Sequence, residues 1–168
     1  MLLNLSLLGL FAASVLADGA AIVAAMNEIA TSNTELGETV ASWDGGLFGT
    51  LPILVQSAKL LIKINKATTI AQDSAPLNTI ETITVAQSTQ NLAGGVETTL
   101  GNVVDAKPKF DKLLLSPIIL LNLKQEESAT DKFSATVVEK VPESLKGAAE
   151  TLVGRIETAF NDAIATYS

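Results

Sequence analysis

The chain has 168 residues, a net charge of −7 from 11 basic and 18 acidic side chains, and neither His nor Cys. The absence of these two residue types excludes Ser-His-Asp and Cys-His nucleophiles, zinc sites built on imidazole or thiolate, and disulfide-stapled mini-proteins. The acidic balance argues against a nucleic-acid partner, which needs a basic face, and the length suits one domain with a sizeable core.

Residues 1–17 have the pattern of a signal peptide. The segment MLLNLSLLGLFAASVLA carries no charged side chain and is shorter than the roughly 20 residues that a membrane span needs. It ends in Val15-Leu16-Ala17, which places small residues at the −3 and −1 positions of a signal-peptidase site. The alternative interpretation is a buried N-terminal helix. We expect cleavage after Ala17, a secreted domain over 18–168, and no transmembrane anchor.

Five prolines divide the rest of the chain into stretches with apolar residues at helical spacing. Proline suits the first turn of a helix and breaks the interior, so each stretch between prolines predicts a helix. The stretch Thr79–Val85 is the one plausible strand, although its flanks favour helix. Short connections between helices of similar length predict an all-α fold, a single antiparallel bundle of about five long helices and one short helix. The long helices are expected at about 19–43, 52–72, 79–106, 117–140 and 143–166, and the short helix at about 108–115.

The predicted helices carry apolar stripes at i, i+3/i+4 and i+7 spacing, with few aromatic residues. Small residues on facing stripes permit two arrangements: an ordinary tight core, or an elongated cavity that admits a lipid chain. In the second arrangement each buried methylene contributes roughly 0.8 kcal/mol. The apolar residues expected to line such a cavity are Met26, Ile29, Val40, Leu54, Ala58, Leu61, Leu92, Val96, Leu100, Phe110, Leu121, Phe133, Val137, Leu152, Ile156 and Phe160.

Four polar residues close to these stripes are candidates for a hydrogen bond to a carboxylate head group: Ser57, Asn65, Gln87 and Ser88. Each is also consistent with a partly exposed helix side chain. A bundle held only by packing can alternatively open at a hydrophobic boundary and adsorb through its inner faces. An internal cavity and surface adsorption involve the same residues, so the pattern does not separate them.

Residues suited to catalysis are sparse. The densest acidic group, Glu126, Glu127 and Asp131, lies in the most polar run, KQEESATDK, whereas a paired-carboxylate site would need one buried member. We interpret this run as a solvated helix face. Neither glycine-rich motif of nucleotide-binding loops occurs. The sequence therefore predicts a protein that is not an enzyme and that has neither a metal site nor a cofactor.

Three segments carry a family resemblance: SWDGGLFGTLPILVQSA at 42–58, AKPKFDKLLLSPIILLNLK at 106–124 and VEKVPESLKGAAETLVGRIETAFNDAIATYS at 138–168. With the signal peptide, they make the chain similar to the fungal hydrophobic-surface-binding protein A family, also called cell-wall galactomannoproteins. The resemblance implies an all-helical secreted domain that captures fatty acids in a bundle cavity or adsorbs to hydrophobic surfaces. It also implies recruitment of a secreted esterase, and an extracellular location or a loose association with the cell wall.

Two hypotheses about function follow. The leading one is a monomeric, secreted, non-enzymatic carrier that binds fatty acids or similar lipids in an apolar cavity between its helices. The alternative is a protein that adsorbs to hydrophobic surfaces, or a cell-wall structural antigen, which recruits secreted esterases without a stable internal ligand.

Overall fold

The computed structural model describes residues 8–168, and within that range the chain forms five long helices and no strand. The all-α prediction is therefore confirmed, and Thr79–Val85 forms helix. Two short 3₁₀ turns, Leu47–Gly49 and Glu143–Leu145, precede the second and the fifth helix. The long helices are α1 (Leu8–Ser42), α2 (Thr50–Asp73), α3 (Thr79–Lys112), α4 (Ser116–Lys140) and α5 (Lys146–Tyr167).

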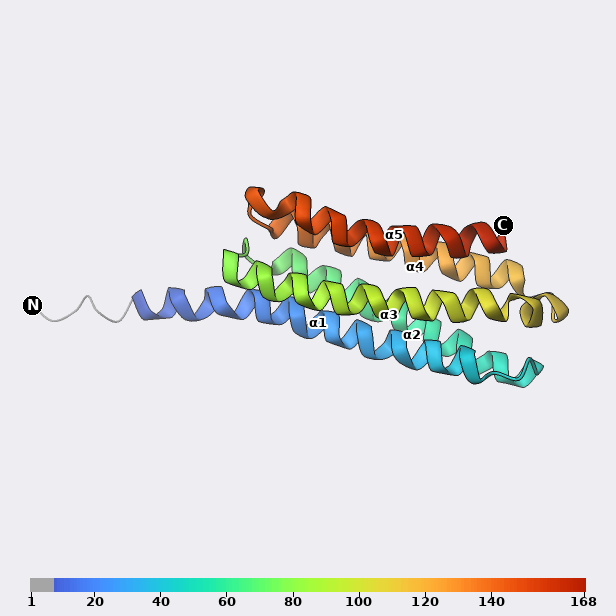
Figure 1. Ribbon diagram of the computed structural model, residues 1–168. Helices are drawn as coiled ribbons and strands as arrows, with labels where there is room; N and C mark the ends of the chain where they lie inside the picture. The colour runs from blue at the N-terminus through green and yellow to red at the C-terminus, as the bar shows by residue number, and fades with distance from the viewer. Residues whose placement is uncertain (1–7) are drawn as a thin grey trace, which may run out of the picture.

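The predicted signal peptide covers two parts of the chain. Residues 1–7 lie outside the described residues, and residues 8–17 form the first turns of α1, which extend beyond the other helices (Figure 1). The contacts of α1 with the bundle include the backbone N–H of Gly19, which donates to Glu81 Oε1 over 3.3 Å, and the fully buried Ile22. The part of α1 that packs into the bundle thus includes residues directly after the expected cleavage site.

The helices form two layers, with α1, α3 and α5 in one layer and α2 and α4 in the other (Figure 1). Consecutive helices run antiparallel, and the packed pairs α1–α3, α3–α5, α5–α4, α4–α2 and α2–α1 close a ring around one core. The α1–α3 pair approaches closely because Gly37 has no side chain. A Cβ atom there would lie 2.5 Å from Thr99 Oγ1.

Side-chain caps fix the ends of helices at one end of the bundle. The Asn78 side chain accepts hydrogen bonds from the backbone N–H groups of Ile80 and Glu81, and Glu81 Oε2 accepts from the Asn78 N–H over 2.9 Å. This reciprocal capping box begins α3. Lys140 Nζ donates to Gln72 O over 3.0 Å, so the last turn of α4 is tied to the end of α2.

The predicted separate helix over 108–115 is wrong, because these residues are divided between the end of α3 and the following turn. α3 continues through Pro108, which is exposed, and ends at Lys112. Proline in a helix interior costs about 3 kcal/mol, but Pro108 lies two residues before Phe110, which is 1% exposed. Burial of that ring against Trp43, with centroids 4.4 Å apart, favours helix across the proline.

Candidate apolar cavity

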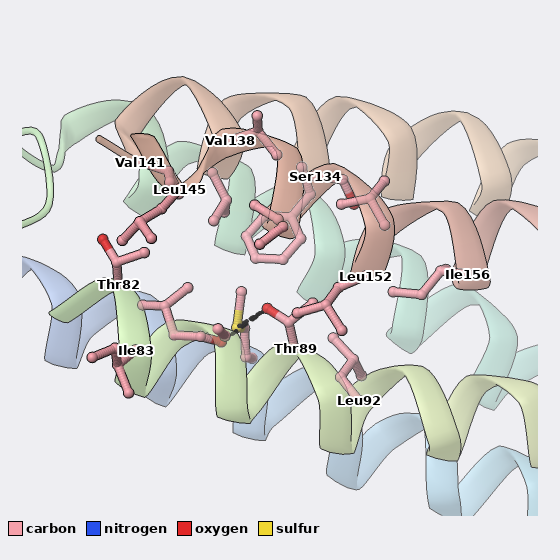
Figure 2. Close-up of a pocket in the computed structure, with 18 of the residues that line it drawn as sticks. Thr82, Ile83, Thr89, Leu92, Ser134, Val138, Val141, Leu145, Leu152 and Ile156 are labelled. Atoms are coloured by element: carbon pink, nitrogen blue, oxygen red, sulfur yellow. Dashed lines mark hydrogen bonds between the residues drawn. The ribbon is translucent and has the colours of Figure 1, made fainter. Parts of the chain in front are cut away.

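A cavity of about 140 Å³ lies between α3, α4 and α5, at the end of the bundle where α3 begins and α4 ends. Figure 2 shows Thr82, Thr89 and Leu92 of α3 facing Val138 of α4 and Leu152 of α5 across it. We call it the end cavity. It is lined by Met26, Thr82, Ile83, Val85, Ala86, Thr89, Leu92, Thr130, Phe133, Ser134, Val137, Val138, Val141, Leu145, Ala148, Ala149, Leu152, Val153 and Ile156.

The walls of the end cavity are uncharged. Two of its hydroxyl groups are engaged within their own helix, because Thr82 donates to Asn78 O over 2.8 Å and Thr89 to Val85 O over 2.9 Å. Short side chains such as Ala149 leave the space open, since they do not reach across to α3. An uncharged, largely apolar surface of this kind favours an apolar guest over a charged one.

Two smaller cavities continue from the end cavity toward the other end of the bundle. The central cavity, of about 40 Å³, shares Leu92, Thr130, Phe133 and Ile156 with the end cavity. The tip cavity, of about 30 Å³, shares Leu36, Val103, Leu123 and Glu126 with the central one. The interior therefore contains three voids in a row, and the shared side chains form the partitions between them.

Glu126 is buried in the partition between the central and tip cavities, so its interpretation as part of a solvated face is wrong. Its side chain is 6% exposed and accepts a hydrogen bond from Ser57 Oγ over 2.6 Å. Burial raises the pKa of the Glu126 carboxyl to about 7, although the Ser57 hydrogen bond opposes that rise. Glu126 is buried because it lies on the same face of α4 as Leu123 and Phe133.

Asn33 is a second buried polar group, on α1. It is 3% exposed and lines the central cavity, and its Nδ2 has no hydrogen-bond partner among the described residues. An unpaired buried polar group of this kind destabilises the fold by about 1–3 kcal/mol. The central cavity therefore differs from the end cavity in having an unused hydrogen-bond donor.

Most of the predicted lining residues point into one of the three cavities. In the end cavity these are Met26, Leu92, Phe133, Val137, Leu152 and Ile156. In the central cavity they include Ile29, Val96, Leu100 and Phe160, and in the tip cavity Val40, Phe110 and the predicted polar residue Ser57.

Seven predicted residues lie elsewhere. Leu121 is 56% exposed because, at 100° per residue, it lies about 120° around α4 from Phe133. α2 is apolar on two sides, and the side that faces the core is that of Ile53 and Leu60. Of the remaining predicted residues, Leu54 is half-buried against the core and Ser88 is half-buried, whereas Ala58 and Gln87 are exposed. Leu61 and Asn65 lie on an outer groove beside Lys124.

Sequence reasoning missed several residues of the end cavity, mainly Thr82, Ala86 and Thr89 of α3 and Ala148 and Ala149 of α5. Thr82 and Thr89 share a face of α3 with Val85 and Leu92, so helical spacing would have found them if polar and small residues had been included. No comparable signal identifies Ala148 and Ala149, because they line a void only through the position of α5 against α3 and α4.

The opposite end of the bundle carries exposed apolar side chains. Phe48 is 94% exposed, Leu114 84%, Leu51 65% and Leu47 59%. They come from the α1–α2 connection, the start of α2 and the α3–α4 turn, which lie at the same end (Figure 1). We call these four residues the apolar tip. By length and composition alone, the segment Leu47–Asp73 is also apolar enough to cross a membrane. Core helices of soluble proteins meet the same criterion.

The comparison of sequences identifies related proteins. A family model described as hydrophobic surface binding protein A matches residues 19–139. Cell wall mannoprotein 1 of Aspergillus flavus is 29% identical over 111 residues, which are 66% of this chain and 41% of that protein. The match therefore spans less than half of the length of that relative.

Solved structures share the fold. One described as AFMP4P in complex with palmitic acid has a TM-score of 0.86 at 24% identity, covering 89% of this chain and 99% of that chain. Ligand binding domain 1 of the Penicillium marneffei MP1 protein, complexed with arachidonic acids, has a TM-score of 0.85 at 16% identity, covering 90% and 99%. Ligand binding domain 2 of that protein, complexed with multiple arachidonic acids, has a TM-score of 0.84 at 20% identity, covering 89% and 95%.

Proposed function

Because the chain belongs to the hydrophobic surface binding protein A family, we propose that it is a non-enzymatic carrier that binds the hydrocarbon chain of a fatty acid or similar lipid in the end cavity. The observation that carries this proposal is the cavity itself, an uncharged void of about 140 Å³ with almost entirely apolar walls. Proteins of the same fold were solved with palmitic acid and with arachidonic acids, which supports an acyl chain as the guest.

The charge distribution favours one orientation of the lipid. Among the described residues no basic side chain lines the end cavity, so a carboxylate head group stays in water at the opening. The hydrocarbon chain enters, and each methylene that leaves water contributes roughly 0.8 kcal/mol. The exposed lining residues, Ile83 of α3 and Ala148 of α5, place the opening between these two helices.

The carrier is proposed to act outside the cell as a monomer, after cleavage behind Ala17. The name of the Aspergillus flavus relative, a cell wall mannoprotein, supports an extracellular or wall-associated location. Expression in a fungal host tests this directly, because the intact mass of the protein in the medium should correspond to a chain that begins at Asp18. A protein retained in the cells with residues 1–17 attached would contradict secretion.

The substitution Leu152→Trp tests lipid binding, since the larger side chain fills the end cavity. We expect native mass spectra of the wild type to show one bound molecule of hexadecanoic acid. Calorimetry should give an affinity for the Leu152→Trp variant that is at least about tenfold weaker. Leu121→Trp is the matched control, because Leu121 is 56% exposed and lines none of the three cavities. Equal affinity of both variants, or no lipid on the wild type, would refute the proposal.

The apolar tip favours a second function, adsorption to hydrophobic surfaces, with recruitment of a secreted esterase to the same surface. Phe48 at 94% and Leu114 at 84% exposure can contact a waxy or polymeric solid without any change in the bundle. The double substitution Phe48→Asp and Leu114→Asp should remove most saturable binding to polystyrene beads. Ile80→Asp is the control, because Ile80 is 73% exposed at the opposite end. Adsorption that survives the double substitution would exclude the tip as the contact.

A further inference from the structure

The central cavity holds two polar side chains with unused hydrogen-bonding capacity. Among the described residues, Asn33 Nδ2 has no hydrogen-bond partner although Asn33 is 3% exposed, and the Glu126 carboxyl is hydrogen-bonded only to Ser57. Buried polar groups are normally satisfied by protein, water or a bound molecule. The unused donor and acceptor therefore indicate a polar guest at this depth of an otherwise apolar interior.

The size and chemistry of the cavity restrict that guest. Its volume of about 40 Å³ leaves room for a small polar group, and Asn33 and Glu126 both line it. A hydroxyl group has the chemistry for both residues, because it can accept from an amide N–H and donate to a carboxyl at the same time. A methyl group would leave the amide unpaired, and a carboxylate would meet the acidic Glu126. No other titratable side chain of the described residues lines this cavity.

A lipid in the end cavity has a route to this position. Leu92, Phe133 and Ile156 form part of the wall between the two cavities, so a change of their rotamers joins them. Val138 of α4 lines the end cavity, and it lies about 18 Å from Glu126 along the helix at 1.5 Å per residue. The far end of a long acyl chain can therefore lie beside Glu126 while its carboxylate stays at the opening.

We propose that the central cavity is a polar subsite, formed by Asn33 and Glu126, that binds the terminal hydroxyl group of an ω-hydroxylated acyl chain. The proposal rests on the proposed function, because the same chain occupies the end cavity. It adds a ligand class to that function. An ordinary fatty acid ends in a methyl group at this position, whereas an ω-hydroxylated chain ends in a hydroxyl group that can form hydrogen bonds. Ser57 holds the Glu126 carboxyl in position through its 2.6 Å hydrogen bond.

Calorimetry on the wild-type protein tests the subsite with three lipids of equal length: hexadecanoic acid, ω-hydroxyhexadecanoic acid, and the isomer with its hydroxyl group beside the carboxyl. We expect the ω-hydroxy acid to bind about tenfold more tightly than the other two, as for one hydrogen bond to a buried unpaired group. If all three bind equally, the subsite proposal fails and the proposed function stands, with only water in the central cavity. If none binds, the proposed function fails as well.

The substitution Asn33→Leu assigns the effect to the subsite. It removes the amide at nearly constant volume, so the preference for the ω-hydroxy acid over hexadecanoic acid should fall to about twofold or less. Ser134→Ala is the matched control, because Ser134 lines the end cavity and not the central one. It should leave the preference intact. A preference that persists in Asn33→Leu would overturn the assignment, and the wild-type series decides the proposal even if that variant does not fold.

Discussion

The two ends of the bundle use apolar side chains in opposite ways. At the cavity end, small residues of α3 and α5 leave an internal void of about 140 Å³. At the tip end, Trp43 and Phe110 pack with ring centroids 4.4 Å apart, while Phe48, five residues after Trp43, is 94% exposed. One end offers space to a molecule that enters, and the other offers a surface. Storage of a lipid and adsorption to a solid should therefore be separable by mutation.

The largest expected effect is on the free energy of unfolding, because side chains pack differently at the two ends. Phe110→Ala should lower the free energy of unfolding by about 3–5 kcal/mol, because it removes a ring that is 1% exposed and packed against Trp43. Leu152→Ala, beside an existing void, should lower it by only about 1 kcal/mol, because fewer contacts are lost. Urea denaturation of both variants measures the difference. Equal losses would mean that the cavity end is as tightly packed as the tip end.

The next effect comes from Glu126, which lies between the two ends. Its pKa of about 7 in the folded protein exceeds the ordinary 4.5, so the folded state binds more protons than the unfolded state between these pH values. The contribution of Glu126 protonation to the free energy of unfolding is fully present below pH 4.5 and is lost as the pH rises through 7. The total loss is roughly 3 kcal/mol.

The substitution Glu126→Gln isolates this effect, because the amide keeps the shape and does not titrate. Carboxyl groups whose pKa is lowered, such as Glu28 beside Lys63, act in the opposite direction but are present in both proteins. We therefore expect the wild type to lose stability relative to the variant as the pH rises from acid to above 7. A stability difference independent of pH would show that the Glu126 carboxyl is not buried.

A smaller effect is expected from filling the void. Ala149→Leu adds apolar atoms inside the end cavity and should raise the free energy of unfolding by about 1 kcal/mol while weakening lipid binding about tenfold. Ala159→Leu is the control on the same helix, because Ala159 lies on an outer groove between α3 and α5. Thermal denaturation and calorimetry check the two quantities. A stabilised variant with undiminished lipid affinity would place the ligand elsewhere.

The smallest effect is at the apolar tip. Leu114 has a backbone φ of +59°, a left-handed conformation that costs a residue with a Cβ atom about 1 kcal/mol or more. Leu114→Gly should relieve this strain, partly offset by the greater chain entropy of glycine, with a net gain of about 0.5 kcal/mol. Lipid binding should not change, since the residue is 84% exposed at the far end. A destabilised variant would mean that the Leu114 side chain contributes packing.

The fold was largely predictable because the helices repeat their apolar residues at a regular period and prolines lie near the starts of α2 and α4. The position of the buried face was less predictable. α2 has apolar residues on two sides, and in α4 the exposed pair Ile118 and Leu121 imitates the buried pair Ile119 and Leu123.

The site was predictable only in part, for two physical reasons. A void depends on how helices pack: Ala149 of α5 borders one together with Thr82 and Val85 of α3, which are distant in sequence. A buried polar group, in turn, looks like a surface residue when its neighbours in sequence are polar. Glu126 could still have been recognised from its spacing of seven residues to Phe133, which places both on one face of α4.

The most direct test is a crystal structure of the protein with ω-bromohexadecanoic acid, read from the anomalous signal of bromine. The bromine should lie inside the bundle near Phe133 and Glu126, with the carboxylate at the opening between α3 and α5. A bromine peak on the outside of the bundle or beside Phe48 and Leu114, with the end cavity empty, would contradict internal binding of the lipid chain.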